Sequence, residues 1–149
     1  MKKEIYVLLH NIRSLYNVGS IFRTADAAGV SKIFICGYTG TPPRKEITKT
    51  AIGAEEYVEW EHYPDPVSLI YELKQKNIQI ISLEKTPKSI DFKTFKPKYP
   101  LCLTLGHELE GVRADILDLS DAVISIPMLG QKESLNVSVA FGISIYSLI

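Results

Sequence analysis

A series of short, almost continuously apolar runs constrains the fold of this chain more than any other feature. The runs lie at residues 4–9, 32–37, 78–83, 100–106 and 122–127, and a shorter β-rich segment lies at 57–60. Such runs are typical of strands that are buried on both faces of a sheet. Because segments with helical spacing lie between them, the sequence predicts an α/β fold, a parallel sheet flanked by helices.

The predicted helices differ in how clearly the sequence marks them. After the first strand, apolar residues recur at helical spacing between Asn17, a predicted N-cap, and Gly29, a predicted terminator. Asp65 and the following proline open an amphipathic helix at 65–77, and shorter helices are predicted at 45–55 and 112–119. The last segment, 134–149, alternates apolar and small residues, which by periodicity alone predicts a strand.

Length and composition predict one minimal domain over residues 1–149, with a single substantial core. No apolar run reaches the length of a membrane span, and the start lacks a signal-peptide pattern, so we expect a cytoplasmic protein without a membrane partner. Cys36 and Cys102 lie inside strand-like runs and are predicted to be buried, reduced thiols. The three histidines have no ligand spacing, so no metal site is expected.

The formal net charge is zero, which argues against a protein that coats nucleic acid through bulk positive potential. Basic residues nevertheless cluster in two places, and either they are simply solvated or they form a local RNA-contacting rim. The loop at 84–99 is long for so small a protein, and such loops are often functional. The two clusters are Arg44, Lys45 and Lys49, and Lys85, Lys88, Lys93, Lys96 and Lys98.

Three segments carry the polar and glycine residues that indicate a ligand site. They lie at 11–29, 105–112 and 126–140, and each follows a predicted strand. Ligands of open α/β sheets bind at the carboxyl ends of the strands, where all three segments begin. The glycine-rich signatures GxGxxG and GxxxxGK[ST] of common nucleotide-binding proteins are absent.

In order and spacing, these segments resemble the three motifs of the SpoU/TrmH branch of the SPOUT RNA methyltransferases. The resemblance implies a parallel α/β sheet with a C-terminal trefoil knot, and a helix rather than a strand at 134–149. It also implies transfer of a methyl group from S-adenosyl-L-methionine to a ribose 2′-hydroxyl of tRNA or rRNA, without a metal. A non-catalytic RNA-binding homologue and a base-methylating SPOUT enzyme remain the alternative hypotheses.

The resemblance also assigns the residues of the site. The positions that match the family's catalytic pocket are Asn17, Arg23, Glu108, Ser134 and Asn136. Those that match the donor-binding loops are Leu83, Gly106, Ile126, Met128 and Leu135. Three roles remain open for Arg23. It could form an ion pair with Asp26, bind an RNA phosphate, or act as the base that deprotonates the 2′-hydroxyl, although arginine is normally always protonated. His107 departs from the family pattern, which leaves its role open.

A homodimer is predicted from the last segment. Built as a helix, residues 135–149 are apolar nearly all round, and a domain of this size cannot cover every face. The resembling family associates through this helix and the helix of the first motif. Arg23 and the donor pocket of one site are therefore expected to come from different chains.

Overall fold

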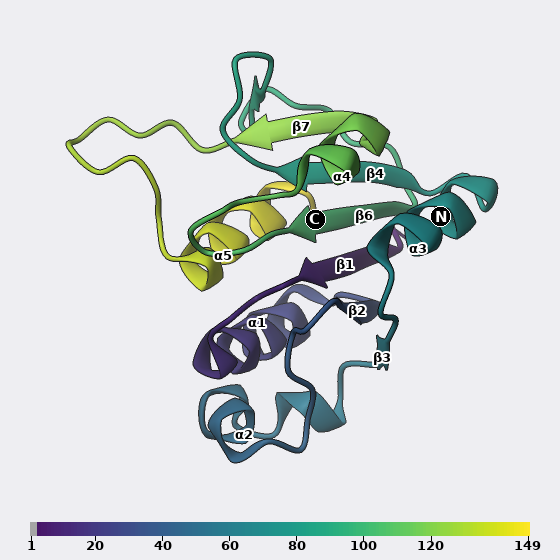
Figure 1. The fold of residues 1–149 in the computed structure, drawn as a ribbon, viewed down its shortest axis with the longest axis vertical. Helices are drawn as coiled ribbons and strands as arrows, with labels where there is room; N and C mark the ends of the chain where they lie inside the picture. The colour runs from purple at the N-terminus through teal and green to yellow at the C-terminus, as the bar shows by residue number, and fades with distance from the viewer. Residues whose placement is uncertain (1–2) are drawn as a thin grey trace.

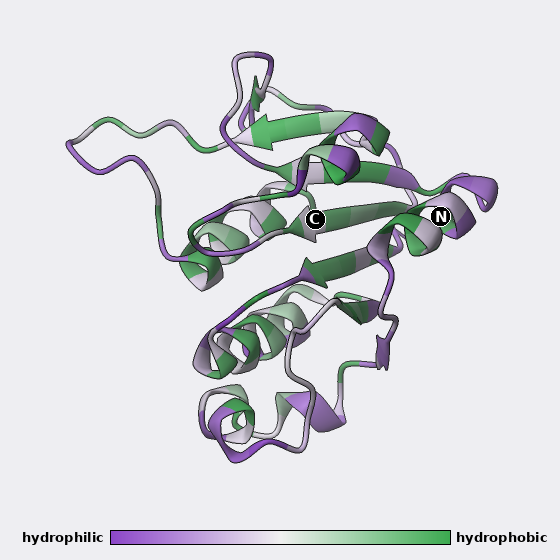
Figure 2. Ribbon diagram, in the orientation of Figure 1, coloured by the Kyte–Doolittle hydropathy of each residue, from purple (hydrophilic) through white to green (hydrophobic). Residues whose placement is uncertain are grey.

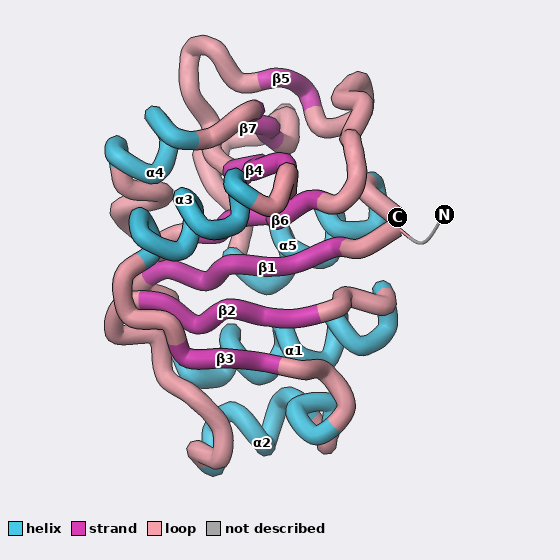
Figure 3. Tube along the Cα trace, turned by 90° about the vertical axis from the view of Figure 1, so that its right-hand side faces the viewer, coloured by secondary structure: helices cyan, strands magenta, loops and turns pink. Residues whose placement is uncertain are grey.

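One parallel sheet organises residues 3–149, which are the residues that the computed structural model describes. Its seven strands lie in the order β3-β2-β1-β6-β4-β7-β5, as Figure 3 shows from bottom to top, and every pairing is parallel. This confirms the predicted parallel sheet flanked by helices. In chain order the elements are β1 (Ile5–His10), α1 (Leu15–Ala28), β2 (Lys32–Cys36), α2 (Lys45–Ala51), the 3₁₀ helix η1 (Ala54–Glu56), β3 (Trp60–His62), α3 (Pro66–Gln75), β4 (Gln79–Leu83), β5 (Ile90–Asp91), β6 (Leu101–Leu105), α4 (Ala114–Leu119), β7 (Ala122–Ser125) and α5 (Val137–Ser147).

Helices cover both faces of the sheet, so the central strands bury side chains in two directions. Helices α1, α2 and α5 lie on one face and α3 and α4 on the other (Figure 1). The strands are correspondingly apolar along their length, whereas polar residues collect on the outer helices and loops (Figure 2). Cys36 and Cys102 are buried, unpaired thiols, as predicted, and burial raises the pKa of Cys36 to about 12.

The prediction that Asn17 caps α1 is wrong, because the helix begins three residues earlier. Ser14 is extended at φ −82° and ψ 119°, and its hydroxyl accepts a hydrogen bond from the Asn17 N–H at 3.2 Å. A serine oxygen that satisfies a free amide of the first turn is what an N-cap supplies. Asn17 therefore lies inside the first turn, with its side chain free for other contacts. The predicted terminator Gly29 does end the helix, at φ 73°.

The segment between β2 and β3 is more broken than predicted. The helix expected over 45–55 ends at Ala51, because Ile52 and Gly53 both take positive φ angles and lead into η1. The strand expected at 57–60 starts only at Trp60, where it pairs with Ile33 of β2. Val58, which precedes the strand, instead packs with Ala54 of η1. Both lie in the same core cluster as Ile47 and Ala51 of α2.

The chain crosses the sheet repeatedly in its second half. After β4 the long loop predicted at 84–99 holds a two-residue strand, β5, that pairs with β7 at the sheet edge. The chain then returns to the middle of the sheet as β6, which lies between β1 and β4. As a result, the loops that follow β4, β6 and β7 end close together at the carboxyl edge of the sheet.

Helix α5 confirms the helix that the family resemblance implied, against the alternating pattern of its sequence. Asn136 caps it, and Phe141, Ser144 and Ile145 are buried against α1 and the sheet. The exposed apolar face of α5 consists of Val139, Ile143, Tyr146 and the following Ile149, which are 50%, 39%, 52% and 45% exposed. None of the described helices is long and apolar enough to cross a membrane.

Candidate active site

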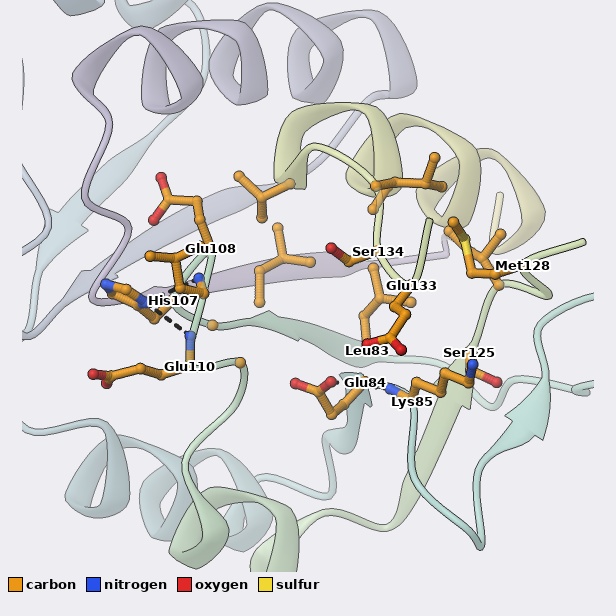
Figure 4. A pocket seen from close by; sticks show the side chains of 18 residues that line it. Leu83, Glu84, Lys85, His107, Glu108, Glu110, Ser125, Met128, Glu133 and Ser134 are labelled. Atoms are coloured by element: carbon orange, nitrogen blue, oxygen red, sulfur yellow. Dashed lines mark hydrogen bonds between the residues drawn. The ribbon is translucent and has the colours of Figure 1, made fainter. Parts of the chain in front are cut away.

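Two adjoining hollows open at the carboxyl edge of the sheet. The first has a volume of about 220 Å³ and is formed by the ends of β4, β6 and β7 and the start of α5 (Figure 4). It brings together all five residues predicted to bind the donor, from three separate loops. These are Leu83, Gly106, Ile126, Met128 and Leu135.

The lining of the first hollow combines apolar walls with acidic side chains. Leucine, isoleucine and valine side chains and the backbone at Gly106 supply a surface that suits a flat apolar ring. A side chain could not replace Gly106, because its Cβ would lie 2.5 Å from the Gly111 carbonyl oxygen. The acids around the hollow, beside the single cation Lys85, are Glu84, Glu108, Glu110 and Glu133 (Figure 4).

The second hollow, of about 560 Å³, lies on the α1 side of the first. Its wall consists of the start of α1, the loop after β6 and the residues that lead into α5. It contains four of the five predicted catalytic residues, Asn17, Glu108, Ser134 and Asn136. Glu108 and Ser134 line both hollows, so ligands in the two would meet there.

A chain of hydrogen bonds connects the three sequence motifs across this second hollow. The Asn17 side-chain amide donates to Glu108 Oε2 at 3.2 Å, and Asn17 Oδ1 accepts from the Asn136 side-chain amide at 3.2 Å. Asn136 Oδ1 in turn accepts from the N–H groups of Ser138 and Val139, which caps α5. Asn17 of the first motif therefore bonds the side chains of both other motifs, Glu108 and Asn136.

Glu108 is held as a carboxylate by the start of α1. Its Oε1 accepts the Arg13 N–H at 2.8 Å, and its Oε2 accepts the Ser14 N–H at 2.9 Å. Burial by itself raises the pKa of Glu108, but these backbone N–H groups and the Asn17 amide favour the charged form more strongly. The pKa of Glu108 therefore lies below its ordinary value.

The lowered pKa of Glu108 predicts an acid-dependent contribution to stability. A carboxylate with a lowered folded-state pKa stabilises the protein above its unfolded-state pKa, and this stability is lost as the pH falls through the folded value. We expect Glu108→Gln to have a lower melting temperature than the wild type at pH 7. The difference between the two melting temperatures is expected to shrink steadily as the pH falls below 4.5. Thermal denaturation of both proteins between pH 7 and pH 3 measures it. A difference that stays constant over this range would contradict the account.

The structure gives His107 a local role that the sequence left open. Its ring Nδ1 accepts hydrogen bonds from the N–H groups of Leu109 and Glu110, both at 3.0 Å. The turn closes with a bridge between His107 and Gly111, where φ is 75°. His107 therefore shapes the loop that presents Glu108, and its Nδ1 carries no proton in this arrangement.

Sequence reasoning missed Glu84, which directly follows β4. Its Oε1 accepts the Val112 N–H at 2.8 Å and its Oε2 accepts the Lys85 N–H at 3.1 Å. A Cβ at Gly111 would lie 2.2 Å from Glu84 Oε1, so a side chain there would displace the Glu84 carboxylate from this position. The signal was an acid at a predicted strand end, in the same place as Glu108 after β6.

Arg23 is the one predicted catalytic residue that the structure does not bring to the others. It is exposed on α1 and lines neither hollow. Within residues 3–149 it forms no ion pair with Asp26, the partner that a purely structural role would require. In a single chain the site therefore consists of Asn17, Glu108, Ser134 and Asn136.

The predicted RNA-contacting residues are all exposed, but they do not form one patch. Lys85 lines the first hollow, and Lys88 is three residues further along the same loop. Lys98 lies at the opposite edge of the sheet, where its N–H donates to Gln79 at the start of β4. Among the described residues, no group of histidine, cysteine and acidic side chains is placed to hold a metal ion.

Comparison with known proteins places this geometry in a family. The model of the SpoU rRNA methylase family matches residues 4–146, so the chain belongs to that family, as the motifs predicted. It is similar to a tRNA (guanosine(18)-2′-O)-methyltransferase of Aquifex aeolicus, with 33% identity over 97% of this chain and 68% of the relative. The enzyme of the same name from Escherichia coli (strain K12) is 30% identical over 96% of this chain and 62% of the relative.

The chain is also similar in structure to a solved methyltransferase. An S-adenosylmethionine-bound rRNA methyltransferase of Sinorhizobium meliloti superposes with a TM-score of 0.91 at 28% identity, over 98% of this chain. The chain spans 56% of that protein, and about two thirds of the length of the two tRNA methyltransferases.

Proposed function

We propose that this chain is an S-adenosylmethionine-dependent RNA methyltransferase that modifies a ribose 2′-hydroxyl. The observation that carries the proposal is the pair of hollows joined at Glu108 and Ser134, with Asn17 and Asn136 bonded across the second. Methyl transfer needs a donor and an acceptor held in line, and adjoining hollows meet that need. The names of the relatives, two of which are tRNA 2′-O-methyltransferases, support the same reaction.

The residues that line the first hollow complement the chemistry of S-adenosylmethionine. Leu83, Ile126 and Leu135 offer apolar contacts to the adenine ring, and Gly106 allows the backbone to approach closely. Carboxylates such as Glu84 and Glu133 complement a ligand with a positive sulfonium centre. When bound, the donor supplies a methyl group activated by that sulfonium. Saturable binding in titration calorimetry tests the assignment, and no heat at millimolar donor would contradict it.

The residues of the second hollow position the acceptor ribose. Asn17 and Asn136 are locked by Glu108 and by the first turn of α5, so their amides are fixed before the RNA binds. Such pre-organised groups lower the barrier because they need no rearrangement during the reaction. Ser134 lines both hollows, and in this proposal it is the residue beside which the 2′-oxygen meets the methyl group.

The proposal includes a homodimer in which Arg23 completes the partner's site. Support comes from the exposed apolar face of α5, which packs beside α1, the helix that carries Arg23. An apolar face of this kind usually marks a protein interface. The Arg23 guanidinium then holds an RNA phosphate near the target ribose, since its planar fork matches phosphate oxygens.

The C-terminal trefoil knot implied by the family also belongs to the proposal. It is supported by the strand order, because β4 lies between β6 and β7 although it precedes both in the chain. The three loops that form the first hollow follow these interleaved strands. A knot there would hold the donor-binding loops together without a metal or a disulfide.

In this proposal the substrate is tRNA or rRNA, and the protein acts in the cytoplasm. Residues 1–149 form a single minimal methyltransferase domain in this proposal. In this proposal the RNA backbone binds to a basic rim formed by Lys85 and Lys88 beside the first hollow and by the exposed Arg44, Lys45 and Lys49.

RNA binding is predicted to depend more on the lysines near the hollows than on lysines at the opposite edge of the sheet. We expect the double variant Lys85→Glu and Lys88→Glu to weaken RNA binding and to reduce the slope of log affinity against log salt by about 2, one for each lost phosphate contact. The matched control is Lys76→Glu with Lys98→Glu, which makes the same charge change near the start of β4, at the opposite edge of the sheet. Fluorescence anisotropy of labelled tRNA at several salt concentrations measures both. Equal loss in the two variants would contradict a localised rim.

A further inference from the structure

The loop after β2 presents an exposed tyrosine from an unusually well-fixed backbone. The Tyr38 side chain is 60% exposed, yet its N–H donates to Asn11 Oδ1 at 3.0 Å. Gly37 takes a φ of 63°, and a Cβ there would lie 1.9 Å from Asn11 Oδ1, so only glycine fits. Asn11 itself has a positive φ of 56°. Glycine and asparagine both adopt the left-handed region readily, so this turn is fixed by the residue types at these two positions.

Two further contacts fix the same loop to the start of α1. The buried Thr39 hydroxyl accepts the Ile12 N–H at 3.0 Å. Gly40 lies so close to Leu15 that a Cβ would approach a leucine methyl to 2.2 Å. Residues 37–40 are therefore held at successive positions along the segment that follows β1. An exposed ring on so rigid a loop has its location determined before any ligand arrives.

Tyr38 follows β2, so it lies at the same carboxyl edge of the sheet as the second hollow. Its partner Asn11 is two residues from Arg13, which lines that hollow and whose N–H binds Glu108. Tyr38 itself lines neither hollow. In the other direction the loop leads to the exposed cations Arg44 and Lys45. Through its backbone, Tyr38 is thus joined to the segment that leads to the acceptor site, and along the chain it is followed by cations suited to the RNA backbone.

We infer that the Tyr38 ring stacks on the nucleobase next to the target nucleotide. Unpaired RNA bases are commonly bound by stacking on exposed aromatic side chains beside basic residues. Because the ring lies outside the hollow, it meets a flanking base rather than the ribose that accepts the methyl group. Tyr38 is then a positioning residue that holds the RNA in register, and this inference rests on the proposed function.

Kinetics of three variants test the inference. Tyr38→Ala is expected to raise the KM for tRNA about tenfold, with the affinity for S-adenosylmethionine and the melting temperature unchanged. Tyr38→Phe keeps the ring and is expected to behave as the wild type. The salt dependence of binding stays the same in both, because stacking neutralises no phosphate. Tyr57→Ala is the matched control, since Tyr57 is 80% exposed but precedes β3 at the opposite edge of the sheet.

A fluorescence measurement separates this inference from the proposed function, because it needs no turnover. The probe is a single-stranded adenosine octamer with one 2-aminopurine, which wild type and Tyr38→Phe are expected to quench and Tyr38→Ala is not. If the chain methylates tRNA but Tyr38→Ala keeps both the normal KM and the quenching, the stacking role is refuted alone. A Tyr38→Phe variant as poor as Tyr38→Ala would also refute it. Absence of methylation by the wild type would instead refute the proposed function.

Discussion

Replacing Arg23 with Ala is expected to lower the rate of methyl transfer by ~100-fold or more while the affinity for S-adenosylmethionine stays unchanged. The reason is location: Arg23 is exposed on α1 and does not line the donor hollow, so its loss removes a contact to RNA and none to the donor. Arg23→Lys is expected to be poor as well, because an ammonium cannot reproduce the planar fork. Single-turnover kinetics and calorimetry with the donor measure the two effects. Full activity in either variant would remove Arg23 from the mechanism.

Mixing two inactive variants shows whether Arg23 acts across a subunit boundary. In a mixture of Arg23→Ala and Asn136→Ala subunits, half of the dimers are mixed, and one of their two sites has every residue intact. We therefore expect activity to return to about a quarter of the wild-type value. The Asn136 variant also loses the cap of α5, worth about 1 kcal/mol, so its folding is checked first. No recovery from folded, exchanging subunits would contradict a shared site.

Introducing charge on the exposed apolar face of α5 is expected to have the second large effect. Val139→Glu combined with Tyr146→Glu places two carboxylates on a surface that is about half exposed in the single chain. The monomer should keep its fold, because neither side chain belongs to the buried core, but the dimer should dissociate. Activity should fall with it, since Arg23 no longer reaches the partner's site. Light scattering at micromolar concentration and a methyl-transfer assay measure the two outcomes.

The matched control for this variant is Tyr71→Glu. Tyr71 is 53% exposed on α3, which covers the other face of the sheet, so the same change is made away from the predicted interface. We expect Tyr71→Glu to leave both the oligomer mass in solution and the methyl-transfer activity unaltered. A wild-type chain that is active as a monomer, or a charged α5 that still dimerises, would overturn the dimer proposal.

Much of the fold follows from local sequence patterns, because buried parallel strands read as apolar runs. The runs ending at Leu83 and Leu105 formed β4 and β6 nearly as predicted, and the polar residues after them reached one edge of the sheet. The residues predicted to bind the donor gathered in one hollow for this reason. The order of strands in the sheet, by contrast, depends on pairing between distant segments and has no local signal.

Where prediction failed, neighbouring residues competed for the same role. Ser14 and Asn17 can both cap a helix, and the earlier one does so, which releases Asn17 to bond Glu108 and Asn136. Helix α5 carries an alternating sequence typical of a strand, but burial of Phe141 and Ile145 on one helical face outweighs local propensity. The contacts of His107 and Glu84 are to backbone N–H groups, which no side-chain pattern reveals.

Identifying the product tests the central claim most directly. The 149-residue chain is incubated with tRNA and S-adenosylmethionine carrying a deuterated methyl group, and the RNA is then digested to nucleosides for mass spectrometry. The account predicts the label on the ribose of a single nucleoside, and no label when that nucleotide is 2′-deoxy, because the 2′-hydroxyl is the acceptor. Label on a base, or no label on tRNA or rRNA despite donor binding, would contradict it.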